Sequence, residues 1–125
     1  MLEQRYTHIL TIEDSEQIRK IFKITLKARA YEVIEAATGK EGLEKLGQYP
    51  VDLVILDLGL PDADGLDILR RLRAVSDVPV IILTVRNDNQ TRKLALEMGA
   101  SHYLTKPFNP LELIEHIDRL VGQNV

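Results

Sequence analysis

The chain contains the stretch Val51-Asp52-Leu53-Val54-Ile55-Leu56-Asp57, an almost wholly apolar run that ends in a carboxylate. A turn-forming segment follows at once: Leu58-Gly59-Leu60-Pro61-Asp62-Ala63-Asp64-Gly65. A short apolar run bounded in this way predicts a strand that is buried on both faces, as in a parallel sheet. Asp57 would then stand at the carboxyl edge of the sheet, where open α/β sheets bind their ligands.

Outward from this strand, the pattern alternates between strand and helix five times. The expected strands cover residues 8–12, 31–35, 51–56, 78–83 and 101–105, and the more alternating second strand suits an edge. The first expected helix follows Ser15, which can cap it. Three more helices are expected at 40–46, 65–73 and 91–98, the last of them with Gly99 as its C-terminal cap, and a fifth begins at Pro110. Helical spacing predicts the following core-facing residues: Ile18, Ile21, Phe22, Leu26, Leu43, Leu46, Leu66, Leu69, Leu72, Leu94, Ala95, Met98, Leu113, Ile114, Ile117, Leu120 and Val121.

This alternation predicts the fold class. Strands that alternate with amphipathic helices form a parallel sheet covered on both faces, with right-handed crossovers. Five repeats indicate an open, doubly wound α/β sheet, because a barrel needs eight repeats and roughly 250 residues. With 125 residues the chain is expected to be one domain, covering 1–125.

Composition excludes several classes of function. The net charge of -3 argues against direct nucleic acid binding by this domain. The absence of cysteine excludes disulfides, thiolate metal sites and a cysteine nucleophile. Because no apolar run resembles a signal core or approaches membrane-spanning length, we expect a soluble cytoplasmic protein without a membrane partner.

Polar side chains end four of the five expected strands. Glu13 and Asp14 follow the first strand, Asp57 ends the third, Thr84 ends the fourth and Lys106 follows the fifth. In a parallel sheet these groups converge on one edge. Three carboxylates at close range repel one another unless a cation is present, and oxygen ligands suit Mg²⁺ better than Zn²⁺. A carboxylate can itself become an aspartyl-phosphate, while a hydroxyl and an ammonium group can neutralise the charge of a transferred phosphoryl group.

Taken singly, each of these residues also fits an ordinary structural role. Glu13 and Asp14 suit the acidic first turn of a helix, Thr84 suits a strand and Lys106 suits the surface. A lone aspartate in a loop is most often a helix cap or a solvated residue. The coincidence of all of them at one end of different strands favours a functional site.

With those residues in place, the chain resembles the receiver domain of two-component response regulators over essentially its whole length. The segments that carry the resemblance are Ile9-Leu10-Thr11-Ile12-Glu13-Asp14, the run from Val54 to Gly65, the run from Val78 to Thr84, and the run from Gly99 to Phe108. The motifs are most similar to those of receivers that precede a winged-helix DNA-binding domain. The resemblance implies a flavodoxin-like (βα)5 fold with strand order 2-1-3-4-5.

The resemblance also implies roles for the acidic residues. Asp57 would be the phosphoacceptor, and its donor would be a phosphohistidine on a sensor histidine kinase or phosphotransfer protein, or a small molecule such as acetyl phosphate. Asp14 and Asp57 would bind Mg²⁺ through side-chain oxygens, Glu13 directly or through a water, and Gly59 through its backbone carbonyl. Enzymatic activity would be limited to self-phosphorylation and self-dephosphorylation.

The remaining implied roles concern the phosphoryl group and the response to it. Thr84 would hydrogen-bond the phosphoryl group and Lys106 would pair with it, while Lys106–Pro107 would be a cis peptide. Thr84 would then move toward the phosphate, and Tyr103 would turn inward to fill the space. The face made by the fourth helix, fifth strand and fifth helix would change shape, as a population shift biased by a local charge.

The chain departs from the pattern of its nearest class on this output face. In that class, two acidic residues normally precede the switch aromatic, and they pair across a homodimer with basic residues on the last helix. In this chain one pair of the dimer face remains at matching positions. Because the other pairs are missing, the sequence gives less reason to expect a homodimer through this face. It gives correspondingly less reason to expect a winged-helix effector domain. The departing residues are Ser101, His102, His116 and Asp118, and the matching pair is Arg92 and Glu112.

A second departure lies beside the expected phosphorylation site. Val85 follows Thr84, where the family more often has a small residue. We therefore expect slower entry of a phosphodonor and slower loss of the phosphoryl group.

Other functions stay open at this stage. The chain could be the regulatory half of a transcriptional regulator or a stand-alone receiver that acts through protein contacts. A Mg²⁺-dependent aspartyl-phosphate phosphatase would need a second acid/base carboxylate, for which the only nearby candidates are Asp62 and Asp64, and these suit a turn before Gly65 better. A flavin or nucleotide binder would need a glycine-rich phosphate loop after the first strand, where Glu13 and Asp14 stand instead.

Overall fold

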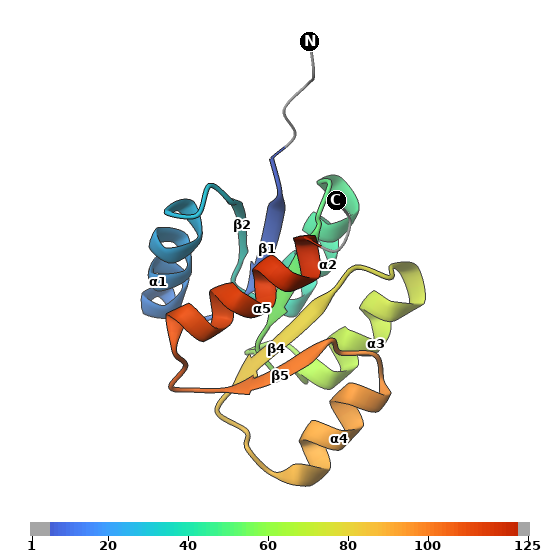
Figure 1. The fold of residues 1–125 in the computed structure, drawn as a ribbon. Helices are drawn as coiled ribbons and strands as arrows, with labels where there is room; N and C mark the ends of the chain where they lie inside the picture. The colour runs from blue at the N-terminus through green and yellow to red at the C-terminus, as the bar shows by residue number, and fades with distance from the viewer. Residues whose placement is uncertain (1–5, 123–125) are drawn as a thin grey trace.

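Five parallel strands form a sheet with helices on both faces in the computed structural model, which describes residues 6–122 (Figure 1). The strand order is β2-β1-β3-β4-β5. This order and the alternation of strand and helix confirm the predicted doubly wound fold. The elements are β1 His8–Ile12, α1 Glu16–Lys27, β2 Glu32–Ala36, α2 Gly39–Gln48, β3 Leu53–Leu56, α3 Gly65–Val75, β4 Val80–Thr84, α4 Asn89–Glu97, β5 His102–Thr105 and α5 Pro110–Gly122.

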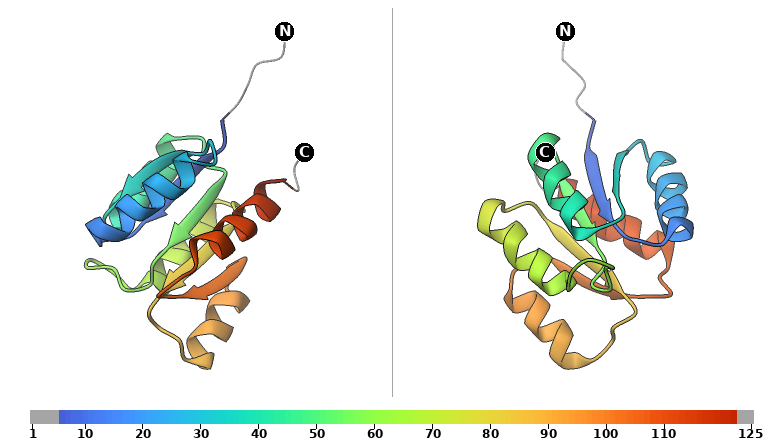
Figure 2. Two further views of the ribbon diagram at one scale, coloured as in Figure 1. Left: turned by 60° about the vertical axis from the view of Figure 1, so that its left-hand side comes forward. Right: turned by 180° about the vertical axis from the view of Figure 1, so that it is seen from behind.

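Two apolar layers lie on opposite faces of the sheet, because successive side chains of a strand point to opposite sides. On β1, Leu10 and Ile12 pack into the layer covered by α2, α3 and α4, whereas Ile9 packs into the layer under α1 and α5. Figure 2 shows this division of the helices from two further directions. The central strands β3 and β4 are buried along their whole length, which explains their nearly continuous apolar sequences.

The helices begin at the carboxyl edge of the sheet and are capped there by side chains. The Ser15 hydroxyl accepts a hydrogen bond from the backbone N–H of Ile18 at the start of α1. The carboxylates of Asp64 and Asp88 do the same at the starts of α3 and α4. Such caps satisfy N–H groups that have no partner within the helix and fix where each strand-to-helix loop ends.

Several boundaries differ from those predicted. The helix α4 begins at Asn89 rather than at residue 91, because Asp88 accepts the N–H of Thr91 and caps the helix earlier. The helices α2 and α3 each extend to a later end, at Gln48 and Val75. The strand β2 lies at one edge of the sheet, as predicted, and β5 lies at the other.

Two residues predicted to face the core do not. Ile21 of α1 is 44% exposed and Leu94 of α4 is 43% exposed. Each immediately precedes a buried residue, Phe22 and Ala95 respectively, and one residue corresponds to a rotation of about 100° around a helix. The spacing of apolar residues identified these helices correctly but placed the edge of each buried stripe one residue too early.

Among residues 6–122, none of the helices combines the length and the apolar character that crossing a membrane requires.

Candidate functional site

The strand register brings the ends of β1 and β3 side by side. Ile12 lies opposite Leu56, and the backbone N–H of Asp57 donates to the carbonyl of Ile12 at 3.0 Å. Glu13 and Asp57 therefore occupy the first positions beyond two adjacent central strands. This places both carboxylates at the carboxyl edge of the sheet, as the sequence predicted.

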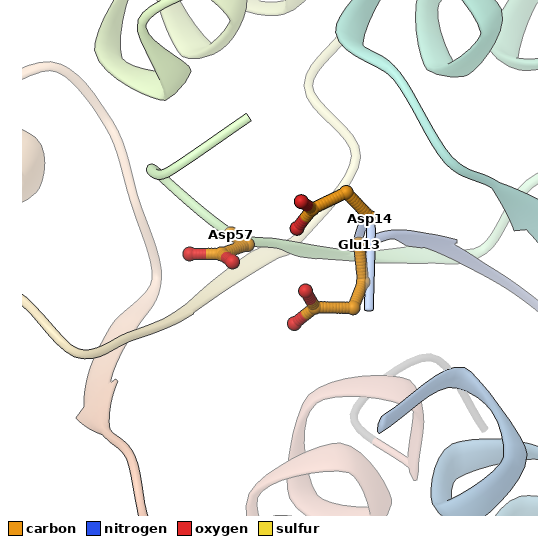
Figure 3. Close-up of side chains that lie close together, drawn as sticks. All are labelled: Glu13, Asp14 and Asp57. Atoms are coloured by element: carbon orange, nitrogen blue, oxygen red, sulfur yellow. The ribbon is translucent and has the colours of Figure 1, made fainter. Parts of the chain in front are cut away.

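Glu13, Asp14 and Asp57 form an acidic cluster whose side-chain oxygens approach within 4.8 Å of one another. Glu13 and Asp14 project from the end of β1 and Asp57 from the end of β3, into a common space (Figure 3). Glu13 and Asp57 are buried, whereas Asp14 is exposed. Three carboxylates with one side open to water fit a hard divalent ion such as Mg²⁺, which prefers oxygen ligands and keeps several of its own waters.

Lys106 bridges two members of this cluster. Its Nζ atom lies 2.6 Å from Glu13 Oε1 and 3.0 Å from Asp57 Oδ2. The strand pairing explains this reach, because Thr84 of β4 lies opposite Thr105 of β5 and the N–H of Lys106 donates to the carbonyl of Thr84 at 2.8 Å. The Lys106–Pro107 peptide is cis, as predicted. The ammonium group thus partly balances the carboxylates at the sheet edge.

The two buried carboxylates differ in their affinity for protons. The pKa of Glu13 is raised to about 7, chiefly by burial and also by the charge of Asp57. The hydrogen bond from Lys106 opposes this rise. Burial also raises the pKa of Asp57, but the N–H of Gly59 and the Lys106 ammonium outweigh it, so this pKa lies below its usual value. Asp57 therefore holds a proton less tightly than Glu13.

The backbone after Asp57 supports its carboxylate. The N–H of Gly59 donates to Asp57 Oδ1 at 3.1 Å. Gly65, at the start of α3, packs directly against this segment, and its N–H donates to the carbonyl of Leu58 at 2.9 Å. The role of the Gly59 carbonyl as a metal ligand stays a prediction.

Thr84 ends β4, and Tyr103 is the second residue of the neighbouring strand β5. Thr84 is fully buried, and its hydroxyl accepts the N–H of Arg86 at 3.4 Å. Tyr103 is only 6% exposed, its hydroxyl donates to the carbonyl of Arg86 at 2.7 Å, and the Arg92 guanidinium lies 5.2 Å from its ring centroid. The inward position of Tyr103, which the sequence led us to expect only after phosphorylation, is therefore already occupied in this structure.

Two arginines at this edge make contacts that the sequence did not reveal. Arg86 supplies the carbonyl that holds Tyr103, and its Nη2 donates to the Thr91 hydroxyl at 3.0 Å. Arg19 contacts the backbone of the acidic loop after β1. No spacing rule could have identified these contacts, because they depend on loop and side-chain directions that the sequence does not fix.

The sequence model of the protein family described as the response regulator receiver domain matches residues 9–118 of this chain. The transcriptional regulatory protein KdpE of Mycobacterium tuberculosis is 42% identical over 118 residues, which are 94% of this chain and 52% of KdpE. The aerobic respiration control protein ArcA of Escherichia coli is also 42% identical over 118 residues, 94% of this chain and 50% of ArcA. The chain thus spans about half the length of these relatives, which are named as regulators and not as enzymes.

Solved structures agree with this assignment. A CheY-like receiver domain protein from Methanospirillum hungatei superposes with a TM-score of 0.90 at 30% identity, covering 95% of this chain and 96% of that one. The chemotaxis protein CheY4 of Vibrio cholerae gives a TM-score of 0.87 at 30% identity, covering 93% and 99%. The order of the strands, the residues at their ends and the family match agree, and the chain belongs to the receiver domain family of two-component response regulators.

Proposed function

We propose that Asp57 is the phosphoacceptor of this receiver. An oxygen of its carboxylate attacks the phosphorus of a phosphohistidine, an O–P bond forms, the P–N bond breaks, and the imidazole leaves with the bonding electron pair and is then protonated. The observation that carries the proposal is the position of the Asp57 carboxylate at the carboxyl edge of the sheet, where the Gly59 N–H contacts it at 3.1 Å and the Lys106 ammonium at 3.0 Å.

The acidic cluster is proposed to hold Mg²⁺ through Glu13, Asp14 and Asp57, with the Gly59 carbonyl as a further ligand. Its oxygen-only composition and the separation of its oxygens by no more than 4.8 Å support this choice of ion. When bound, Mg²⁺ supplies positive charge against the oxygens of the transferred phosphoryl group. Lys106 adds an ammonium group to the same side of Asp57, and Thr84 offers a hydroxyl from the neighbouring strand end.

The response to phosphorylation is proposed to run through Thr84 and Tyr103. Because Tyr103 is already inward, the expected effect is a population shift that stabilises this arrangement. Thr84 would give up its contact with the Arg86 N–H in favour of the phosphoryl group. The loop that carries the Arg86 carbonyl, and hence the start of α4, would adjust with it.

The phosphodonor is proposed to be a sensor histidine kinase or phosphotransfer protein, and the chain is proposed to be the regulatory half of a transcriptional regulator. The second statement is supported by the names of KdpE and ArcA and by the share of their length that this chain covers. A homodimer through the α4, β5 and α5 face would have to use Arg92 and Glu112. Asp118 is engaged within the chain, where Arg29 Nη2 lies 2.9 Å away and the Tyr31 hydroxyl donates to it.

The phosphatase alternative finds no support at the site. The Asp62 carboxylate accepts the N–H groups of Gly39 and Lys40 at 2.8 and 3.0 Å, so it caps α2. The Asp64 carboxylate caps α3 through the N–H of Leu66. Both candidate acid/base groups are therefore committed to helix starts.

The test of the proposed function is covalent modification. Wild type, Asp57→Asn and Asp67→Asn are incubated with acetyl phosphate, with and without Mg²⁺, and analysed by intact-protein mass spectrometry. Asp67 is the matched control because it is an aspartate on α3 that pairs with Arg70 and Arg71 at the surface. We expect Mg²⁺-dependent modification of wild type and Asp67→Asn and none of Asp57→Asn. Equal modification of all three proteins would overturn the assignment.

A further inference from the structure

Arg19, the fourth residue of α1, reaches back to the loop that carries two of the acidic residues. Its Nη1 atom donates to the carbonyl oxygen of Glu13 at 2.8 Å and to that of Asp14 at 2.9 Å. Its Nε atom lies 3.7 Å from Glu35 Oε1 on β2, and the side chain is only 19% exposed. A single guanidinium group thus ties two successive peptide units to the neighbouring strand.

The loop has few other backbone contacts. The N–H of Glu13 still donates to the carbonyl of Ala36, but within residues 6–122 the carbonyls of Glu13 and Asp14 accept no hydrogen bond other than those from Arg19. The N–H of Ser15 donates to Glu13 Oε2 at 3.2 Å, which again depends on where the Glu13 side chain lies. Removing Arg19 would therefore release the loop at the point where its two carboxylates are attached.

We infer that Arg19 is a positioning residue that orients Glu13 and Asp14 for divalent-ion binding, an inference that rests on the proposed function. The contrast with Lys106 carries the argument. Lys106 bonds the carboxylate oxygens themselves and so occupies positions that an ion would use. Arg19 instead bonds the carbonyls behind them, so it holds the backbone that carries the Glu13 and Asp14 carboxylates without contacting their oxygens.

The geometry also requires a guanidinium group in particular. Two N–H bonds of one planar nitrogen serve two carbonyls while a second nitrogen faces Glu35. A lysine has one compact ammonium group on a flexible stem and presents no such rigid fork. Arg19→Lys keeps the charge but loses this arrangement, which separates the effect of geometry from that of charge.

The experiment is calorimetric titration of the intact chain with Mg²⁺ alone, using wild type, Arg19→Gln, Arg19→Lys and Lys20→Gln. Lys20 is the matched control, since it is the next cation on α1, and it pairs with Glu16 at 3.7 Å, with side chains 70% and 75% exposed. Outer partners of metal ligands typically contribute at least tenfold to affinity, so we expect Mg²⁺ binding to weaken about tenfold in Arg19→Gln. Arg19→Lys should weaken it severalfold, and Lys20→Gln should match wild type.

Amide hydrogen exchange without Mg²⁺ supplies a second readout, in which Arg19→Gln should speed exchange at the Ser15 N–H and leave the β3 amides protected. Affinities equal to wild type in both Arg19 variants would overturn the inference while the proposed function stands. Failure of wild type itself to bind Mg²⁺ would overturn the proposed function, and the inference with it. If Arg19→Gln does not fold, as judged by circular dichroism, the Mg²⁺ affinity of Arg19→Lys relative to wild type decides the inference instead.

Discussion

Gly65 lies directly behind Leu58, so closely that a Cβ atom at position 65 would stand 2.3 Å from the Leu58 Cα atom and 2.7 Å from the Asp57 carbonyl oxygen. Both neighbours are backbone atoms, which cannot rotate away as a flexible side chain can. The start of α3 is therefore packed against the peptide that positions Asp57. The glycine is required for this close approach and not for a left-handed backbone conformation.

Gly65→Ala should consequently disturb the site as well as the fold. We expect a loss of about 2 kcal/mol in the free energy of unfolding, as for other overpacked positions, and slower modification of Asp57 by acetyl phosphate. Gly47→Ala is the control, because a Cβ atom there has no neighbour within 4 Å, and it should stabilise the helix α2 by about 0.5 kcal/mol. Urea unfolding measures both changes, and similar values for the two variants would contradict the packing argument.

Lys106→Ala should strengthen Mg²⁺ binding. The ammonium group lies 2.6 Å from Glu13 Oε1 and 3.0 Å from Asp57 Oδ2, so it competes with a cation for these oxygens. Removing it should raise the affinity for Mg²⁺ by at least about fivefold, since two charges a few ångströms apart interact by more than 1 kcal/mol at a partly buried site. Calorimetry checks this, with Lys45→Ala as a control, whose ammonium lies 4.0 Å from Glu41 Oε2 on α2. Unchanged or weaker Mg²⁺ binding by Lys106→Ala would show that the lysine does not compete.

Val85→Ala should shorten the lifetime of the aspartyl-phosphate. Val85 is 69% exposed and lines, together with Lys106, an apolar surface depression formed by α1 and the segment after β5. A smaller side chain there should admit water and acetyl phosphate more readily, so both modification and its reversal should become severalfold faster. Val75→Ala, 77% exposed at the end of α3, should change neither rate. The decay of modified protein over time, followed by mass spectrometry, decides the matter, and equal lifetimes in wild type and Val85→Ala would refute it.

Acidification should destabilise the chain through His102. Burial is the main reason that the pKa of His102 lies below its usual value, and the nearby charges of His116 and Arg119 lower it further. The unfolded chain therefore binds this proton more tightly than the folded chain. The contribution of neutral His102 to stability is complete above the unfolded pKa of about 6.5 and is lost as the pH falls through the folded value.

The measurement is urea unfolding of wild type and His102→Gln at about pH 7.5 and about pH 5.5, on either side of the usual histidine pKa. Wild type should lose more stability between these values than His102→Gln, because only wild type has the His102 ring, whose centroid lies 4.3 Å from that of His116. Because both proteins are measured at the same two pH values, the difference between their stability changes cancels the contributions of the groups that they share, including Glu13. Identical pH dependence of the two proteins would exclude His102 as the cause.

The convergence of the site could be predicted from sequence because it depends on topology alone. Once the strands are known to be parallel, the residues that follow them must meet at one edge, and this places Glu13, Asp57, Thr84 and Lys106 together without any knowledge of side-chain geometry. The Ser15 cap and the helix start at Pro110 were predicted for a similar reason, because local chemistry at helix starts is short-range.

What could not be predicted depends on rotation and direction. Ile21 and Leu94 were placed in the core because apolar spacing defines a stripe only to within one residue, and their helices turn the neighbouring residues inward instead. The contacts of Arg19 depend on carbonyl orientations in a loop, which have no counterpart in residue type. The inward Tyr103 reflects a choice between two side-chain positions that both suit the same sequence.

The bridge made by Lys106 has a consequence for the synthesis of the protein. It joins residues 93 and 49 positions apart in the chain, since Glu13 follows the first strand, Asp57 the third and Lys106 the last. A nascent chain that has left the ribosome only as far as β4 carries Asp57, the proposed phosphoacceptor, but neither the lysine nor the last edge of the sheet. Competence to receive a signal should therefore arise only when translation of the domain is complete, so unfinished chains would not draw phosphoryl groups away from finished ones.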